Sequence, residues 1–165
     1  MTNNLKEKKK LFFNKKNIYF LIIIILIFIS DRFSKIEIIS NFSENTYFIS
    51  NFINLDLIWN TGIGFGLLSS NSSLIYNLIT TLIGFVILIL FYTAIILDKA
   101  NKFIYCIIIG GALGNFYDRL IYKAVPDFID LHYASFHWFT FNVADIYITL
   151  GILFFIMKEF FVNKT

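Results

Sequence analysis

The most informative segment of the chain runs from Leu74 to Leu97 and reads LIYNLITTLIGFVILILFYTAIIL. It contains no charged residue. As a helix it would rise about 36 Å, which exceeds the hydrocarbon thickness of a bilayer, about 30 Å. The segment therefore predicts a transmembrane helix.

Three other apolar segments have a similar length, at about 18–39, 103–122 and 142–162. Only residues 98–102 separate the second segment from the third, which predicts an antiparallel hairpin. The uninterrupted part of the first, Ile18 to Ser30, would rise only about 20 Å, so its outer third must carry polar groups. A cleaved signal peptide is the competing interpretation, but no small-x-small site follows, which favours an uncleaved anchor.

The composition agrees with a membrane protein of one domain, residues 1–165. Hydrophobic residues make up 58% and charged residues 15% of the chain, whereas soluble domains are nearer one quarter charged. Cys106 is the only cysteine, so an intramolecular disulfide is excluded, and we expect a buried thiol. Nothing requires more than a monomer.

Basic residues indicate the orientation. Six lysines precede Asn17, and Lys99, Lys102, Lys158 and Lys164 lie at the same predicted side. A basic run can be a nucleic-acid tail, but before an apolar segment it more often marks the cytoplasmic side. We therefore expect both termini in the cytoplasm and two outward connections, at about 40–73 and 123–141.

The first outward connection has the pattern of a small sheet. Tyr47 to Trp59 mixes aromatic and branched residues, the triplet at 60–62 is a turn signal, and Gly64 and Gly66 leave the backbone free to bend. The predicted fold class is an all-α membrane protein with four transmembrane helices. A small extracytoplasmic β-sheet platform is expected between spans 1 and 2.

Polar residues gather at the outer ends of three spans, where ionisable groups are costly and commonly functional. The first span carries Asp31 and Lys35 on one helical face. The third span carries a polar stripe with a spacing of four, formed by Gly111, Asn115 and Arg119, with Asp118 beside it. Asp127 and Asp130 lie in the connection before the fourth span, which begins with Asn142 and Asp145.

Each member alone has an ordinary structural explanation. Asp31 and Lys35 could be a snorkelling ion pair, and Asp118 could compensate its neighbour Arg119. Asn142 could be a helix cap with an acid in the first turn, and a single loop aspartate such as Asp127 commonly belongs to a turn. Their convergence at one depth favours a functional site.

Carboxylates are the reactive groups available in quantity. The chain has neither a His-Glu-x-x-His zinc motif nor a Gly-x-Ser-x-Gly elbow. His132 and His137 are five apart, a poor spacing for one helical face, and we interpret them as interfacial. Two neighbouring aspartates sharing a proton can activate water for attack on a carbonyl, so no metal or cofactor is expected.

Five stretches closely resemble the bacterial signal peptidase II (lipoprotein signal peptidase) family, in the family's order. They are DRFSK (31–35), NTGIGFG (60–66), GGALGNFYDRL (110–120), VPDFID (125–130) and FNVAD (141–145). Gly64 and Pro126 depart from the family pattern, which commonly has Ala and an apolar residue there. The proline is expected to stiffen the approach to the next residue.

The resemblance implies an aspartic endopeptidase of the bacterial inner membrane that cleaves diacylglyceryl-modified prolipoproteins. It implies that Asp127 and Asp145 are the catalytic pair, a choice that spacing alone leaves open against Asp118 and Asp130. Membrane lipids, the prolipoprotein substrate and globomycin-type inhibitors are the implied partners. Residues expected to line or brace the substrate site are Asp31, Lys35, Asn60, Gly62, Asn115, Arg119 and Asn142, with Asp118 as structural support that holds Arg119 or a nearby backbone group.

Three alternatives were weighed against this hypothesis. A presenilin-like protease would need a Gly-x-Gly-Asp motif, which the chain lacks. A proton or ion translocator would need polar groups continuing inward, but 82–97 and 151–157 are nearly free of them. A purely structural membrane subunit predicts that cleavage is insensitive to every aspartate substitution.

Overall fold

A computed structural model describes residues 15–42, 45–62 and 73–162 of the chain. Its helices are α2 (Lys15–Asn41), α3 (Ser73–Ile96), α4 (Lys99–Ile121) and α5 (Val143–Val162). Its strands are β1 (Tyr47–Phe48), β2 (Ile53–Asn60), β3 (Val125–Tyr133) and β4 (Phe136–Phe141). All four predicted helices are present, with ends within a few residues of the predicted ones.

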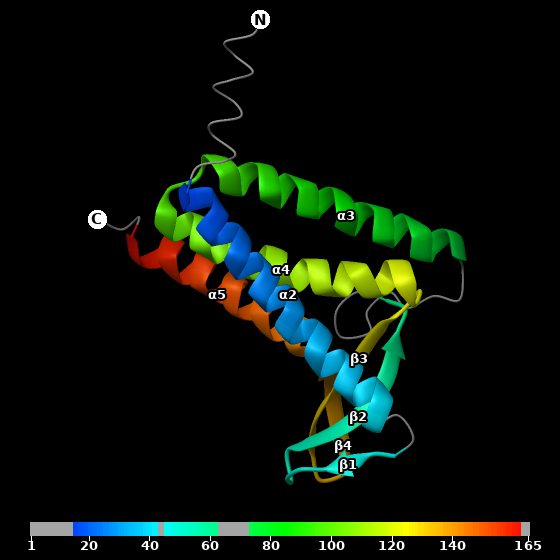
Figure 1. Ribbon diagram of the computed structural model, residues 1–165. Helices are drawn as coiled ribbons and strands as arrows, with labels where there is room; N and C mark the ends of the chain where they lie inside the picture. The colour runs from blue at the N-terminus through cyan, green and yellow to red at the C-terminus, as the bar shows by residue number, and fades with distance from the viewer. Residues whose placement is uncertain (1–14, 43–44, 63–72, 163–165) are drawn as a thin grey trace, which may run out of the picture.

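The four helices form a bundle around α4, which packs against α2, α3 and α5 (Figure 1). The sheet lies at one end of this bundle, whereas the start of α2 and the end of α5 lie at the other end. A side chain at Gly111 would bring a Cβ to 2.6 Å from the Ala144 carbonyl oxygen of α5. Glycine at this position therefore allows α4 and α5 to pack closely.

Within the described residues, three helices are long and apolar enough to cross a membrane: Asn17–Asn41, Ser73–Ile96 and Asn101–Ile121. Helix α5 has 20 residues, but Asp145 lies near its start and Lys158 and Glu159 near its end. Because of these three charges, α5 is less uniformly apolar than the three helices named above and is not counted with them.

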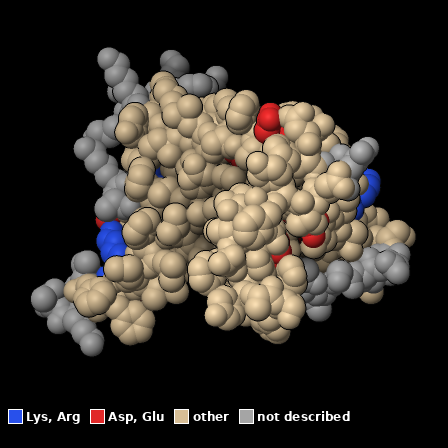
Figure 2. Space-filling model, turned by 90° about the horizontal axis from the view of Figure 1, so that it is seen from below, with Lys and Arg blue, Asp and Glu red and all other residues tan. Residues whose placement is uncertain are grey.

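The helix surfaces facing away from the bundle are apolar. Leu74, Leu78 and Leu88 of α3 are each at least two-thirds exposed. Charged side chains are also sparse on the face of the molecule shown in Figure 2. Apolar surface on this scale is stable in lipid and unfavourable in water, so the helices indicate a membrane-embedded protein.

The sheet is antiparallel, with the order β1-β2-β3-β4. Strands β1 and β2 confirm the platform expected between the first two spans. However, the prediction was incomplete, because β3 and β4 come from the connection between α4 and α5. A two-stranded ribbon is marginally stable in isolation, and pairing β2 with β3 gives it two further strands.

Pro126 lies in β3 opposite Trp59 of β2, whereas pairing with β4 begins only at Ile129. Proline lacks a backbone donor, so it is tolerated where a strand has a neighbour on one side only. The other departure from the family pattern, Gly64, lies outside the described residues, as do Gly66 and the leading lysines before residue 15.

Candidate active site

Two carboxylates meet where the sheet joins the helix bundle. Asp127 is in β3 and is 2% exposed, while Asp145 is half-buried in the first turn of α5. From the sequence, Asp127 was expected in the connection before the last helix. The structure places it within a strand, opposite Ile58 of β2, which gives its backbone a fixed position.

Asn142 connects the two aspartates. Its Nδ2 donates to Asp127 Oδ1 at 2.6 Å, and its Oδ1 accepts from the Asp145 backbone N–H at 3.1 Å. Its own backbone N–H donates to Asp145 Oδ2 at 3.1 Å. The last two bonds form a reciprocal capping box at the start of α5. The predicted N-cap is thus present, and the same side chain also orients Asp127.

Two further amides hold the remaining carboxylate oxygens. Asn60 Nδ2 donates to Asp127 Oδ2 at 2.8 Å, and Asn115 Nδ2 donates to Asp145 Oδ1 at 2.8 Å. Asn60 Oδ1 also accepts from the Gly62 backbone N–H at 2.8 Å. Each aspartate is therefore fixed by side chains from two different elements.

The environment of Asp127 favours its protonated form. Burial raises the pKa of Asp127 from its ordinary value of 3.8 to about 7, and the neighbouring charge of Asp145 acts in the same direction. Hydrogen bonds from Asn60 and Asn142 and the charge of Lys35 oppose this rise in pKa but do not cancel it. Near neutral pH the pair can therefore hold one proton.

A buried ionic network lies behind the aspartates. Lys35 is fully buried, and its Nζ donates to Asp31 at 2.9 Å, to Asn115 at 2.7 Å and to Asp118 at 2.7 Å. These contacts use all three of its donors. The other oxygen of Asp118 pairs with Arg32. The network connects α2 to α4 and orients Asn115, which in turn orients Asp145.

Asp31 also sets the position of α5. Its Oδ1 accepts from the Ala144 backbone N–H at 3.0 Å, while its Oδ2 binds Lys35. Gly114 leaves the space for this carboxylate, because a Cβ at that position would overlap Asp31 Oδ2. One carboxylate thus joins α2 to the beginning of the helix that carries Asp145.

Arg119 of α4 holds the backbone that follows β2. Its Nη2 donates to the Gly62 carbonyl, and Tyr76 Oη donates to the Arg119 carbonyl at 2.8 Å. Within the described part of the chain, Arg119 Nη1 is buried without a hydrogen-bond partner.

The structure brings together all nine residues that the sequence analysis assigned to catalysis or to the substrate site. The expected partner of Asp118 was wrong: its side chain binds Arg32 and Lys35 of α2, because the neighbouring side chain of Arg119 extends toward Gly62. Asp31 and Lys35 do pair, but in the protein interior rather than as a snorkelling pair. Two residues of the site were not predicted: Arg32, although it stands inside the DRFSK stretch, and Tyr76, for which no local signal exists.

An apolar groove leads to the site from the side. It has a volume of about 240 Å³, and among the described residues that line it Asp145 alone is ionisable. The other lining residues come from β4 and α5: Phe139, Phe141, Ile146, Thr149 and Leu150. The groove therefore offers an apolar binding surface next to a carboxylate.

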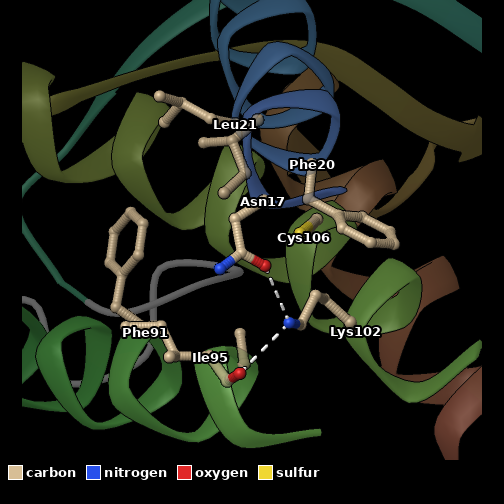
Figure 3. Close-up of a pocket in the computed structure, with 9 residues that line it drawn as sticks. Asn17, Phe20, Leu21, Phe91, Ile95, Lys102 and Cys106 are labelled. Atoms are coloured by element: carbon tan, nitrogen blue, oxygen red, sulfur yellow. Dashed lines mark hydrogen bonds between the residues drawn. The ribbon is translucent and has the colours of Figure 1, made fainter. Parts of the chain in front are cut away.

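A second cavity of about 240 Å³ lies among α2, α3 and α4, toward the opposite end of the bundle (Figure 3). Lys102 Nζ donates there to Asn17 Oδ1 at 3.0 Å and to the Ile95 carbonyl at 3.1 Å. Cys106 also lines it and is 2% exposed, as expected for a buried thiol. None of the residues around the aspartates lines this cavity.

Comparison with known proteins gives a consistent result. The family model described as signal peptidase (SPase) II matches residues 23–161. A lipoprotein signal peptidase of Pelagibacter ubique (strain HTCC1062) is 49% identical over 142 residues, covering 84% of this chain and 86% of that protein. A lipoprotein signal peptidase of Francisella tularensis subsp. novicida (strain U112) is 35% identical over 150 residues, covering 84% and 89%. A solved bacterial membrane enzyme superposes with a TM-score of 0.71 at 26% identity, covering 89% of this chain and 92% of that one.

Proposed function

Because the chain belongs to the signal peptidase II family, it is a peptidase, and we propose that it removes the signal peptides of diacylglyceryl-modified prolipoproteins with Asp127 and Asp145 as its catalytic pair. The observation that carries this proposal is the position of Asn142, whose side chain bonds to both aspartates. The Asn142 side chain binds the Asp127 carboxylate and the Asp145 backbone N–H, and the Asn142 backbone N–H binds the Asp145 carboxylate, so one residue links the two aspartates whatever their separation in the sequence.

The proposed reaction needs one proton on the pair. In the proposed cycle Asp127 carries that proton; burial and the charge of Asp145 raise its pKa, and the two carboxylates titrate as a pair. The ionised Asp145 then takes a proton from water as the water attacks the scissile carbonyl. Asp127 donates its proton to the carbonyl oxygen. When the tetrahedral intermediate collapses, the proton taken up by Asp145 passes to the leaving amine, and a hydroxyl group of the intermediate returns a proton to Asp127 as the carbonyl reforms.

Two features support binding of a lipid-modified substrate. The groove beside Asp145 is apolar and opens along α5 and β4, so an acyl chain or an apolar signal-peptide segment can enter from the side. Arg119 Nη1 is buried and lacks a partner among the described residues, so we propose that it donates to a substrate carbonyl once binding moves the side chains that cover it. In this proposal the remaining polar residues orient the aspartates and Arg119.

The proposed topology has four spans, both termini in the cytoplasm and the active site at the outer face of the bacterial inner membrane. Helix α5 would rise about 30 Å, enough to cross the hydrocarbon core. Its charges lie at its two ends, where they can reach the headgroups. The start of α2 and the end of α5 share one end of the bundle, opposite the sheet (Figure 1).

Substitution of the aspartates tests the catalytic assignment. With a diacylglyceryl-modified prolipoprotein in detergent micelles, Asp127→Asn and Asp145→Asn should each lower kcat at least 1,000-fold, because each removes a proton-transfer group. Asp56→Asn is the matched control, since Asp56 lies in β2 of the same sheet and accepts from Thr46. Cleavage at the normal rate by either active-site variant contradicts the assignment.

Filling the groove tests the route of the substrate. Leu150→Trp should lower kcat/KM at least tenfold for the lipid-modified precursor, because the larger side chain occupies the groove. Leu153→Trp is the control, because Leu153 is a half-exposed residue of α5 that does not line the groove. Equal effects of both substitutions would indicate that the groove does not receive the substrate.

A further inference from the structure

The β3–β4 hairpin brings three potential metal ligands together. Asp130 and His132 are in β3, and His137 is in β4 directly opposite His132. One atom from each residue lies within 4.8 Å of the others. The five-residue spacing of the histidines is poor for one helical face, but it places them across from each other in a hairpin. The objection raised from the sequence therefore does not apply.

The ligand atoms converge on one carboxylate oxygen. His137 Nδ1 lies 2.8 Å from Asp130 Oδ2, and His132 Nδ1 lies 3.5 Å from the same oxygen. The two imidazole rings are stacked, with a centroid distance of 5.4 Å and an interplanar angle of 26°. Zinc bonds of about 2.0–2.2 Å place tetrahedral ligand atoms roughly 3–3.5 Å apart, so only small movements are needed to admit an ion.

Two buried atoms at this place have no hydrogen-bond partner among the described residues. One is Nδ1 of His132, a residue that is 7% exposed, and the other is Oδ1 of Asn54. Asn54 is the cross-strand partner of Asp130 in β2, so its side chain is on the same face of the sheet. Buried polar groups are almost always paired. A cation beside Asp130 would supply the partner that the His132 nitrogen and the Asn54 amide oxygen lack among the described residues.

The turn and the strand register of the hairpin place the two histidines opposite each other. The turn between the strands has Ala134 at φ 52°, a positive value typical of a tight hairpin turn. A register shift between Leu131 and His132 changes the pairing next to the turn and brings His132 opposite His137. Such bulges commonly re-aim side chains at sites.

We propose that Asp130, His132 and His137 bind a divalent transition metal of the zinc class, with Asn54 or a water molecule as the fourth ligand. Imidazole nitrogen favours zinc over magnesium and calcium. Asp130 is an odd number of residues from Asp127 along β3, so the two side chains lie on opposite faces of the strand. The ion is thus a structural clamp between β3 and β4 and takes no part in peptide cleavage. This inference does not depend on the proposed peptidase reaction.

Zinc binding by the full-length protein tests the proposal. The protein is purified in detergent through a tag without histidine, because the chain itself has only two. It is then treated with EDTA, dialysed and titrated with ZnCl₂ against a chromogenic chelator. We expect one zinc ion per chain. His137→Asn should weaken the affinity at least 100-fold, and because the His137 side chain is 59% exposed, this variant should fold normally.

His132→Asn should have the same effect, whereas Cys106→Ser should bind as the wild type does and exclude the thiol as the ligand. Zinc should also raise the unfolding temperature of the wild type but not that of His137→Asn. No stoichiometric binding by the wild type, or equal binding by His137→Asn, overturns the proposal. EDTA should leave prolipoprotein cleavage unchanged, and a loss of cleavage would overturn the structural role of the ion.

Discussion

Asp127→Asn should change how the stability of the protein depends on pH. The folded-state pKa of Asp127 is about 7, against an ordinary value of 3.8. The folded protein therefore binds this proton more tightly than the unfolded chain does. The resulting stabilisation is complete below about pH 4 and is lost as the pH rises through 7. Asparagine keeps the shape of the side chain but carries no titratable group.

The size of the effect follows from linkage. Each pH unit between the two pKa values changes the free energy of unfolding by about 1.4 kcal/mol, so from pH 5 to pH 7 the wild type should lose about 2 kcal/mol relative to Asp127→Asn. For a protein of this size this corresponds to roughly 4–8 °C in Tm. The difference in Tm between the two proteins is the quantity to compare, because titrating groups that are not coupled to Asp127, as Asp145 is, contribute equally to both proteins.

The assay is thermal unfolding in detergent micelles at pH 5, 6, 7 and 8, followed by tryptophan fluorescence. The absolute Tm of the variant at one pH is less informative. The new side-chain NH₂ group at position 127 faces the NH₂ group of Asn60 or Asn142, so one of the two hydrogen bonds to this side chain is lost. Its cost of about 1–3 kcal/mol is the same at every pH. Parallel Tm profiles for the two proteins would refute the assigned environment of Asp127.

Three other substitutions test the scaffold around the pair. Asn142→Ala should lower kcat at least 100-fold with a small change in KM, measured by steady-state cleavage, because the Asp127 carboxylate loses one of its two amide donors and the Asp145 backbone N–H loses its cap. Lys35→Met should lower the free energy of unfolding by about 3–5 kcal/mol, because it leaves two buried aspartates without their shared cation; denaturant titration measures this. Gly114→Ala should cost about 1–3 kcal/mol in the same assay, because the new methyl group overlaps Asp31. A Gly114→Ala protein as stable as the wild type would show that α2 and α4 are not in close contact there.

The helices could be predicted from the sequence because the information is local. A run such as Leu74–Leu97 specifies its own structure through hydropathy, and the observed α3, Ser73–Ile96, differs by one residue at each end. The capping pair Asn142 and Asp145 was also predictable, since its members are three residues apart. By contrast, α5 carries charges at both ends, and composition alone does not decide whether it spans the membrane.

The contacts that the sequence analysis missed are non-local. Arg32 and Asp118 are 86 residues apart in the chain, so nothing near Asp118 indicated that its partners lie in α2 rather than at Arg119. The second half of the sheet was missed for a similar reason. Its strands lie in the other outward connection, and pairing between two connections leaves no periodic signal in either one.

Polar contacts join the helices toward both ends of the bundle. Near the aspartates, Lys35 of α2 binds Asp118 of α4. Toward the far end, Lys102 of α4 donates to Asn17 of α2 and to the Ile95 carbonyl of α3. Tilting one helix in a thinner or thicker bilayer would break one of these sets of bonds, so the surrounding lipid is expected to adapt instead and the spacing of Asp127 and Asp145 to stay constant.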